Sequence, residues 1–504
     1  MTDLHPPLTF DPTRAEGADM THQPQPDHLL NHIDGVWTAS ASGDTRDNRN
    51  PANIDDVIGA FTESITADVT AAVDAAEAAQ PAWDAIGPIE RAKVLTRAAR
   101  LIEERIDLFA AAITREQGKR LSEARGEVTR SLAILEFTIG EARRINGVTT
   151  PAEEPRTVVM TFRRPLGVVG LITPWNFPVA IPMWKVAPAL LAGCGAVLKP
   201  SPLTPWTSAL LVQAFADAGL PDGVLNLIQG DREAGEAIVN DPRVAGISFT
   251  GSLPVGQAIN RAGANRLMRT QLELGGKNAL IVLADADLDA ATDAIIHGAF
   301  GQSGQRCSAT SRVIVDAAVH DELLSRLVPR VQAMRVGAGD QEWADIGPVV
   351  NEERQVACLT AIERAVADGA EVAVGGAAAE LETPGYFVQP TVLDQVAWDS
   401  HLAQEEVFGP VLSVITCEGY DDAMRISNSV KYGMSGTIFT QDPARIFQAL
   451  QDFQAGMLHV NRPGVGAYSH LPHMGAKASQ LGAPECSPDV WNFYTDLRSA
   501  CIRY

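Results

Sequence analysis

The chain has 504 residues, of which 46% are hydrophobic and 20% are charged, and 40 Lys and Arg against 62 Asp and Glu give a formal net charge of −22. This length exceeds one ordinary domain and allows about three-quarters of the unfolded surface to be buried. Phosphate contacts need clustered basic side chains, so we expect neither nucleic acid nor an anionic membrane surface as a partner.

Cysteine usage and the N-terminal segment bear on the compartment. The six cysteines are widely spaced without a CxxC pair, so we expect no disulfide framework and no bound metal. Residues 1–25 are polar and lack the apolar centre of a signal peptide, which predicts a mobile tail. The most apolar stretch, Gly167–Leu198, contains four prolines and a lysine, which is unfavourable for a membrane span. A cytoplasmic protein is therefore expected.

The first 150 residues are predicted to be mainly helical. Ile33–Trp37 is expected to form a short strand and turn, and Asn50-Pro51 marks a second turn. Apolar residues then recur at three- and four-residue spacing, which predicts long amphipathic helices over Ala71–Gln80 and Ile89–Ile113. A third helix is expected over Leu121–Arg144.

Short apolar or β-branched runs follow, separated by helical segments. Strands are expected at Thr157–Phe162, Val168–Ile172, Ala196–Leu198, Val224–Leu227, Gly246–Phe249, Ala279–Leu283, Arg312–Val315, Glu371–Val374, Val411–Thr416 and Asn492–Tyr504. Helices are expected at Ala187–Ala192, Ser208–Ala218, Ala234–Asn240, Leu288–Phe300, His320–Arg335 and Glu353–Asp368. This alternation predicts an α/β protein with two doubly wound parallel sheets in tandem.

The segment Pro174–Pro178 (PWNFP) directly follows a predicted strand, at the end where parallel sheets bind ligands. Its Asn176 has two interpretations. The side chain could cap the next helix, or it could supply an amide donor to an oxyanion hole.

A strand-to-helix turn at Phe249–Ser252 carries Gly251, and Gly256 follows five residues later. Glycine would let backbone N–H groups approach a phosphate at the helix N-terminus. The pattern is not GxGxxG, so an ordinary turn is an equal alternative.

Glu273 precedes two glycines and Lys277 in the run Glu273–Asn278. An apolar setting would raise the pKa of this carboxyl and suit it to act as a base. The alternative is a strand-end carboxylate paired with Lys277.

Cys307 lies in the run Gly301–Ser308 (GQSGQRCS), after a predicted helix. The adjacent Arg306 and the surrounding donors are features of an activated thiol nucleophile. A buried and inert cysteine is the alternative, which we assign to the other five.

In this order and spacing, the four segments resemble the NAD(P)-dependent aldehyde dehydrogenase superfamily. The resemblance extends from about Asn31 to Tyr504 and includes Lys199-Pro200-Ser201 and Glu405–Pro410 (EEVFGP). It implies a cofactor-binding α/β domain at 26–144 and 165–272, and a catalytic domain at 273–470. It also implies a small β-extension at 145–164 and 488–504, which usually pairs across subunits in a homodimer or homotetramer.

The resemblance also assigns roles. Cys307 matches the nucleophile that attacks the aldehyde and forms a thiohemiacetal and then a thioester. Asn176 and the Cys307 N–H match the oxyanion hole, and Glu273 matches the base that activates water. Lys199 is placed both in the catalytic set and at the adenosine ribose. The implied cofactor contacts are Ile172, Thr173, Pro174, Trp175, Lys199, Ser201, Gly251, Ser252, Gly256, Leu274, Glu406 and Phe408.

Some positions depart from the family pattern. NAD-preferring members usually carry Glu where this chain has Pro202, so we expect NADP⁺ to be accepted or preferred. The C-terminal signature, usually close to Pro-Phe-Gly-Gly, is here Pro472–Gly475 (PHMG). His473 could contact substrate or serve only in packing.

The substrate expectation rests on two further positions. Members acting on succinic semialdehyde carry Arg where this chain has Trp184 and Gly301, which disfavours that substrate. The runs Trp175–Lys185 and Gly304–Cys307 resemble the branch acting on α-ketoglutarate semialdehyde (2,5-dioxopentanoate). Arg163, Arg164 or Arg306 could supply a cation for its carboxylate, or could form structural ion pairs.

Three alternatives remain open from the sequence. The chain could be a CoA-acylating semialdehyde dehydrogenase, although such members typically lack the base at Glu273. It could act on other aliphatic or aromatic aldehydes. A non-catalytic protein on the same fold is disfavoured because Cys307, Glu273 and Asn176 are all present.

Overall fold

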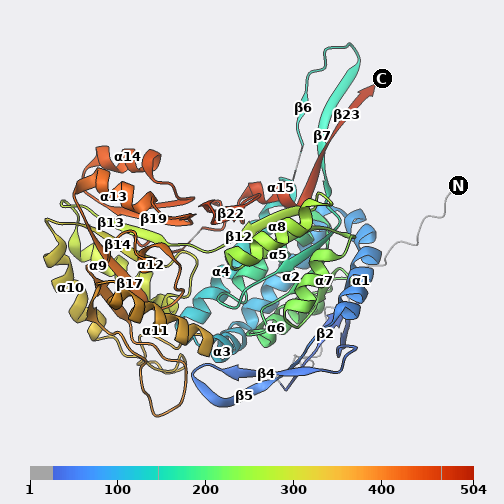
Figure 1. The fold of residues 1–504 in the computed structure, drawn as a ribbon. Helices are drawn as coiled ribbons and strands as arrows, with labels where there is room; N and C mark the ends of the chain where they lie inside the picture. Colours follow the sequence, from blue (N-terminus) through green and yellow to red (C-terminus); the bar gives the residue numbers. More distant parts are fainter. Residues whose placement is uncertain (1–26, 146, 467) are drawn as a thin grey trace.

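A computed structural model describes residues 27–145, 147–466 and 468–504, so the predicted tail at 1–25 lies outside the described residues. Its first large element is an eight-stranded sheet (Figure 1). The strand order is β22 (Gln480–Leu481), β12 (Arg269–Glu273), β11 (Val244–Thr250), β8 (Val168–Ile172), β9 (Gly195–Lys199), β10 (Leu225–Leu227), β2 (Asn31–Ile33) and β3 (Val36–Thr38). The five strands from β12 to β10 are parallel, and β22, β2 and β3 add antiparallel edges.

Helices cover both faces of this sheet because its strands are apolar on both sides. In β8, Val169 and Leu171 enter one hydrophobic core, whereas Val168 enters another. This is the period-two alternation of a strand buried on both faces. One core receives α2 (Gly87–Glu104), α3 (Ile106–Gln117), α4 (Leu121–Gly140), α5 (Ala180–Ala192) and α6 (Pro205–Asp217), and the other receives α1 (Thr66–Ala85), α7 (Arg232–Asn240) and α8 (Leu253–Ala264).

The second module repeats this design. Its seven-stranded sheet has the order β15 (Glu371–Val374), β16 (Thr391–Asp394), β17 (Val411–Cys417), β14 (Thr310–Asp316), β13 (Asn278–Val282), β19 (Ser435–Phe439) and β20 (Met457–Val460). Only β15 is antiparallel to its neighbour. One core receives α9 (Leu288–Phe300) and α10 (His320–Gln332), and the other receives α11 (Glu352–Ala367), α12 (His401–Gln404), α13 (Gly419–Asn428) and α14 (Pro443–Asp452). The predicted pair of doubly wound α/β modules is confirmed.

Three smaller sheets complete the strands. The first consists of β1 (His28–Leu29), β5 (Asn53–Thr62) and β4 (Thr45–Asn50), and a two-stranded ladder joins β18 (Tyr432–Gly433) to β21 (Ala476–Lys477). The third consists of β23 (Thr495–Arg503), β7 (Thr157–Pro165) and β6 (Thr149–Thr150). This last sheet extends away from the two modules, with the C-terminus near its tip (Figure 1). The short helix α15 (Trp491–Tyr494) leads into β23.

The strand expected over Asn492–Tyr504 begins only at Thr495, because Trp491–Tyr494 form α15. Two other local predictions were wrong. The single helix expected over Ile89–Ile113 is broken between α2 and α3 at Arg105, whose guanidinium pairs with Asp217 of α6 at 2.7 Å. This buried ion pair stabilises a bend that an apolar pattern cannot indicate. The second error is the omission of β4 and β5, although the predicted turn at Asn50-Pro51 does lie between them. No helix in the described ranges is long and apolar enough to cross a membrane.

Candidate active site

The predicted site residues gather along the carboxyl edge of the eight-stranded sheet. The last residues of β8 and β9 are register partners, Ile172 with Lys199, and Thr250 at the end of β11 pairs with Glu273 at the end of β12. Parallel strands must bring their carboxyl ends to one edge, which is where open α/β sheets bind ligands. Only residues 274–277 separate β12 from β13 of the other module, so the edge faces the junction of the two modules.

A cavity of about 460 Å³ lies at this junction. It is lined by ten of the predicted residues: Pro174, Trp175, Asn176, Gly251, Ser252, Glu273, Leu274, Cys307, Glu406 and Phe408. Five other predicted residues do not line it: Ile172, Thr173, Lys199, Ser201 and Gly256. Gly256 has a packing role instead, because a Cβ there would overlap the side chain of Leu274.

A second cavity of about 280 Å³ is also lined by Cys307. Its walls include the apolar side chains of Phe177, Ile181 and Trp184 together with Arg130. Cys307 therefore lies where the two cavities meet.

The loop before Cys307 holds an unusual backbone. Gln302, Ser303 and Gly304 have φ values of 53°, 55° and 69°, and the first two lie in a region that residues with a Cβ seldom occupy. Tertiary hydrogen bonds maintain this conformation: the Gln302 N–H donates to Glu123 at 2.9 Å, and the Ser303 hydroxyl donates to the Gly347 carbonyl at 2.8 Å. Backbone strain held in this way is common at functional sites.

The surroundings of Cys307 disfavour its thiolate. Burial raises its pKa well above the usual range, and the negative charge of Glu273 raises it further. The Asn278 amide donates to the Cys307 carbonyl at 2.8 Å and fixes the backbone of the nucleophile. A thiol in this environment needs an acceptor for its proton before it can attack.

The side chain of Asn176 points towards the loop that carries the nucleophile. Its amide donates to the Gln305 carbonyl at 3.1 Å, and α5 begins at Ala180 with no side-chain cap. The helix-capping alternative for Asn176 is therefore wrong. The amide lines the Cys307 cavity, as an oxyanion donor requires.

A buried ion pair holds the Asn176 turn in place. Lys119 donates to Glu127 at 2.6 Å and to the Asn176 carbonyl at 2.7 Å. The other Glu127 oxygen accepts from the N–H groups of Val179 and Ala180 at 2.8 and 3.1 Å. Sequence reasoning missed this pair, because positions 119 and 127 lie far from 176 along the chain.

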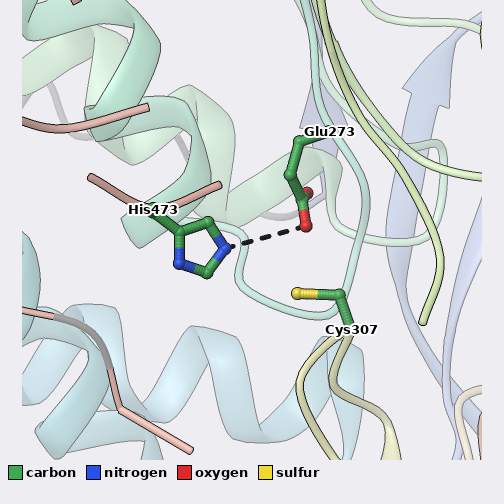
Figure 2. Close-up of side chains that lie close together, drawn as sticks. All are labelled: Glu273, Cys307 and His473. Carbon is green, nitrogen blue, oxygen red and sulfur yellow. Dashed lines mark ion pairs between the residues drawn. The ribbon is translucent and has the colours of Figure 1, made fainter. Parts of the chain in front are cut away.

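Glu273 is fully buried, and its carboxylate has no hydrogen-bond partner among the described residues other than the Cys307 thiol. The predicted pair with Lys277 does not form, since the Lys277 ammonium is also without a partner there. The nearest cationic candidate is His473, whose Nε2 lies 3.7 Å from Glu273 Oε1 (Figure 2). The imidazole packs against the Trp184 ring, with centroids 4.5 Å apart and the ring planes tilted by 38°. His473 also lines the second cavity.

The wall opposite Cys307 fits a nucleoside sugar and an aromatic ring. Glu406 accepts from the Gly276 N–H at 2.8 Å, and burial raises its pKa to about 7. Gly275 must lack a side chain, because a Cβ would overlap the Glu406 carboxylate. Trp175 and Phe408 meet edge to face at 5.5 Å and present apolar surface beside this carboxylate. Carboxylate and aromatic groups in these positions suit the ribose and ring of a nicotinamide nucleotide.

Lys199 lies farther along the same edge. Burial lowers its pKa to about 8, opposed by the charges of Asp231 and Glu63. Arg46 forms ion pairs with both of these carboxylates. Two cations thus face two carboxylates, and Pro202 adds no further negative charge.

Of the arginines considered from sequence, two lie outside the site. Arg163 donates to Thr495 at 2.9 Å beside β23, and Arg164 pairs with Asp84 at 2.7 Å. Arg306 does line the second cavity, as does Arg130, which sequence reasoning missed. Arg130 has no distinguishing local motif, because it is one charged residue among several on an amphipathic helix.

Comparisons with known proteins agree with this geometry. The family model described as "Aldehyde dehydrogenase family" matches residues 37–500. An α-ketoglutaric semialdehyde dehydrogenase of Bacillus subtilis is 39% identical, over 94% of this chain and 98% of the relative. A 2,5-dioxopentanoate dehydrogenase of Saccharolobus solfataricus is 41% identical, over 88% and 93%.

Solved structures show the same fold. An E. coli enzyme described as NADP dependent superposes with a TM-score of 0.92 at 33% identity, covering 95% of this chain and 98% of that one. A Staphylococcus aureus betaine aldehyde dehydrogenase in complex with NAD⁺ gives a TM-score of 0.92 at 31% identity, covering 97% of each chain. The chain therefore belongs to the aldehyde dehydrogenase family, and it is an oxidoreductase that oxidises an aldehyde with a nicotinamide cofactor.

Proposed function

We propose that this enzyme oxidises a short semialdehyde with a distal carboxylate, with α-ketoglutarate semialdehyde as the best candidate. The observation that carries this proposal is the unpaired cation in the second cavity. Arg130 lines that cavity, stacks over Trp184 at 5.3 Å, and has no ion-pair partner among the described residues. Glu123 and Glu127 also line the cavity, and the Glu127 charge acts on Arg130 from a distance. A guanidinium that forms no ion pair favours an anionic ligand of matching geometry.

The neighbouring cation supports the same substrate class. Arg306 lines the same cavity and pairs with Glu123 at 4.0 Å, while its Nε has no hydrogen-bond partner in the described ranges. A volume of about 280 Å³ accommodates a five-carbon chain between Cys307 and Arg130. The relatives from Bacillus and Saccharolobus are named for this semialdehyde, which agrees with the proposal.

The proposed chemistry uses one group for each task. Glu273 accepts the Cys307 proton. The transfer forms the thiolate and neutralises the carboxylate at the same time, so the two groups no longer repel each other as like charges. The thiolate attacks the aldehyde carbon, and the Asn176 amide and the Cys307 N–H stabilise the alkoxide of the thiohemiacetal. The nicotinamide cofactor supplies the hydride acceptor. Glu273 releases the first proton to solvent and then takes a proton from water, which attacks the resulting thioester, so that the carboxylic acid leaves and the Cys307 thiolate is restored.

Hydrolysis is preferred over transfer to CoA because the base is present. Glu273 is buried beside the sulfur, and its two oxygens are free to bond water. Finding an acyl-CoA as the major product when CoA is supplied would replace this proposal with the acylating alternative.

Both nicotinamide cofactors are expected to serve, with NADP⁺ accepted or preferred. Lys199, with a pKa of about 8, and Arg46 lie near the expected 2′-phosphate, and Pro202 offers no carboxylate to repel it. Lys199 and Ser201 are assigned to the adenosine end, which is why they lie outside the cavity beside Cys307.

The division into domains follows the sheets. Segments 26–144 and 165–272 supply most of the eight-stranded sheet and its helices, and 273–470 supplies the seven-stranded sheet. The proposed bridging segments, 145–164 and 488–504, are supported by β6, β7 and β23 of the extended sheet, whose strand edges suit pairing with a second subunit in a homodimer or homotetramer. All six cysteines are free, which is the usual state in the cytoplasm, our proposed location.

The test is the substitution Arg130→Met, which keeps the length of the side chain and removes its charge. The rate of NAD(P)H formation is measured with α-ketoglutarate semialdehyde and with pentanal, an uncharged aldehyde of equal chain length. Losing a charge-assisted hydrogen bond removes about 1.5–3 kcal/mol, so kcat/KM for the semialdehyde should fall about ten- to a hundredfold while that for pentanal changes little.

The matched control is Arg125→Met on the same helix, where Arg125 is exposed and pairs with Asp107. It should leave both substrates unaffected. Equal losses of kcat/KM for both aldehydes in the Arg130 variant would mean that Arg130 has a structural role. A wild-type enzyme that is inactive with the semialdehyde but active with pentanal would overturn the proposed substrate.

A further inference from the structure

Three side chains at the meeting point of the two cavities form a donor set, and the oxidation gives a role to only two of them, the nucleophile Cys307 and the base Glu273. A sulfur of Cys307, an imidazole nitrogen of His473 and a carboxylate oxygen of Glu273 all lie within 4.8 Å of one another (Figure 2). Thiolate, imidazole and carboxylate are the ligand types that Zn²⁺ takes in proteins. The three come from the end of β12, the loop before β14 and the loop before β21, so no sequence spacing indicates them.

The donors lack other partners. Apart from the contact between Glu273 and the Cys307 thiol, the oxygens of Glu273 and both ring nitrogens of His473 are buried without a hydrogen bond among the described residues. The 3.7 Å between Glu273 and His473 is too long for a hydrogen bond. A buried polar group without a partner is unfavourable, so a cation that all three donors can coordinate relieves this cost.

The spacing is close to that of a tetrahedral site. Zinc bonds of about 2.0–2.3 Å place ligand atoms roughly 3.3–3.8 Å apart. The Glu273–His473 distance of 3.7 Å already meets this spacing, and the Cys307 sulfur lies within 4.8 Å of both donor atoms. The other two donors are well held: His473 exchanges backbone hydrogen bonds with Glu485 at 2.9 and 3.0 Å, and Glu273 ends a buried strand.

We propose that Glu273, Cys307 and His473 form an inhibitory binding site for Zn²⁺. Binding forms the metal–sulfur bond, releases the thiol proton to solvent and changes no oxidation state. The fourth position, facing the second cavity, is left to water. Because the metal occupies both the nucleophile and the base, the dehydrogenase is inactive while it is bound and recovers when it is removed. The proposal does not depend on which aldehyde is the substrate.

The direct test is a titration of the metal-free protein with Co²⁺, a spectroscopic substitute for Zn²⁺, without substrate or cofactor. We expect a cobalt–thiolate charge-transfer band that saturates at one ion per subunit and is displaced by Zn²⁺. Cys307→Ala should abolish the band, and His473→Phe, which removes a ligand and keeps a ring on Trp184, should weaken binding at least about tenfold. His459→Phe is the matched control, because His459 lines the same cavity outside the cluster, and binding should be unchanged.

A second measurement follows inhibition. Zn²⁺ should abolish turnover and protect Cys307 from alkylation over the same range of concentration. A chelator should restore both turnover and the alkylation of Cys307. His473→Gln serves as a second variant if the Phe substitution lowers the melting temperature. An absent cobalt band, or wild-type affinity in both His473 variants, would overturn the site. These outcomes are separate from the substrate test, since cobalt binding is measured without any aldehyde.

Discussion

Replacing Glu273 by Gln should make Cys307 more reactive towards alkylation while it stops turnover. The two effects have opposite signs because the carboxylate serves the reaction as a base, yet in the resting enzyme it repels the thiolate. Its charge is one of the causes that raise the Cys307 pKa, after burial itself. The substitution removes the charge and keeps the shape, so the thiol pKa falls and alkylation begins at lower pH.

The magnitude follows from the geometry. The sulfur and the carboxylate oxygen lie within 4.8 Å of each other, and like charges at that distance repel by about 3 kcal/mol in an effective dielectric of about 20. This energy corresponds to roughly a hundredfold in the thiolate fraction at pH 7. A less basic thiolate is also a weaker nucleophile, which cancels about half of the logarithmic gain. We therefore expect alkylation to become about tenfold faster.

The assay is the rate of iodoacetamide labelling at Cys307, followed by peptide mass spectrometry across a pH series without cofactor. Glu406→Gln is a graded control, because the Glu406 charge also raises the Cys307 pKa but ranks below Glu273 among the causes. It should accelerate labelling less. Slower or unchanged labelling in Glu273→Gln would refute the reasoning, because Glu273 would then be activating the resting thiol instead of repelling its anion.

Two further predictions concern the cofactor and the scaffold. Pro202→Glu should lower kcat/KM for NADP⁺ at least about tenfold relative to NAD⁺, because like charges placed together are unfavourable by several kcal/mol; a wild-type enzyme that already strongly prefers NAD⁺ would contradict the cofactor proposal. Lys119→Met leaves Glu127 charged and buried, and should reduce the free energy of unfolding by about 3–5 kcal/mol in a denaturant titration. Lys93→Met, which breaks an exposed pair with Glu90, should change it by less than about 1 kcal/mol, and similar losses in both variants would contradict the role given to the Lys119 pair.

The fold was predictable where local pattern and burial agree. Both faces of β8 and β9 are buried, so their apolar runs stand out, and both strands were predicted within a residue or two. The strand β4 was missed because its sequence, TRDNRN, is polar and mostly exposed, and only pairing with β5 makes it a strand. The break at Arg105 was missed because a partner on a distant helix causes it.

For the site, the sequence by itself determined the chemical groups: the nucleophile, the base and the amide each lie in a distinctive short motif. Only the tertiary structure decided how these groups are tuned. Burial and the Glu273 charge raise the thiol pKa, the Lys119–Glu127 pair holds the Asn176 turn, and Arg130 faces the second cavity. His473 was known from sequence only as a departure from a motif, and its place beside Glu273 and Cys307 became visible in the fold. The physical reason is that a motif records neighbours along the chain, whereas charge, desolvation and coordination depend on neighbours in space.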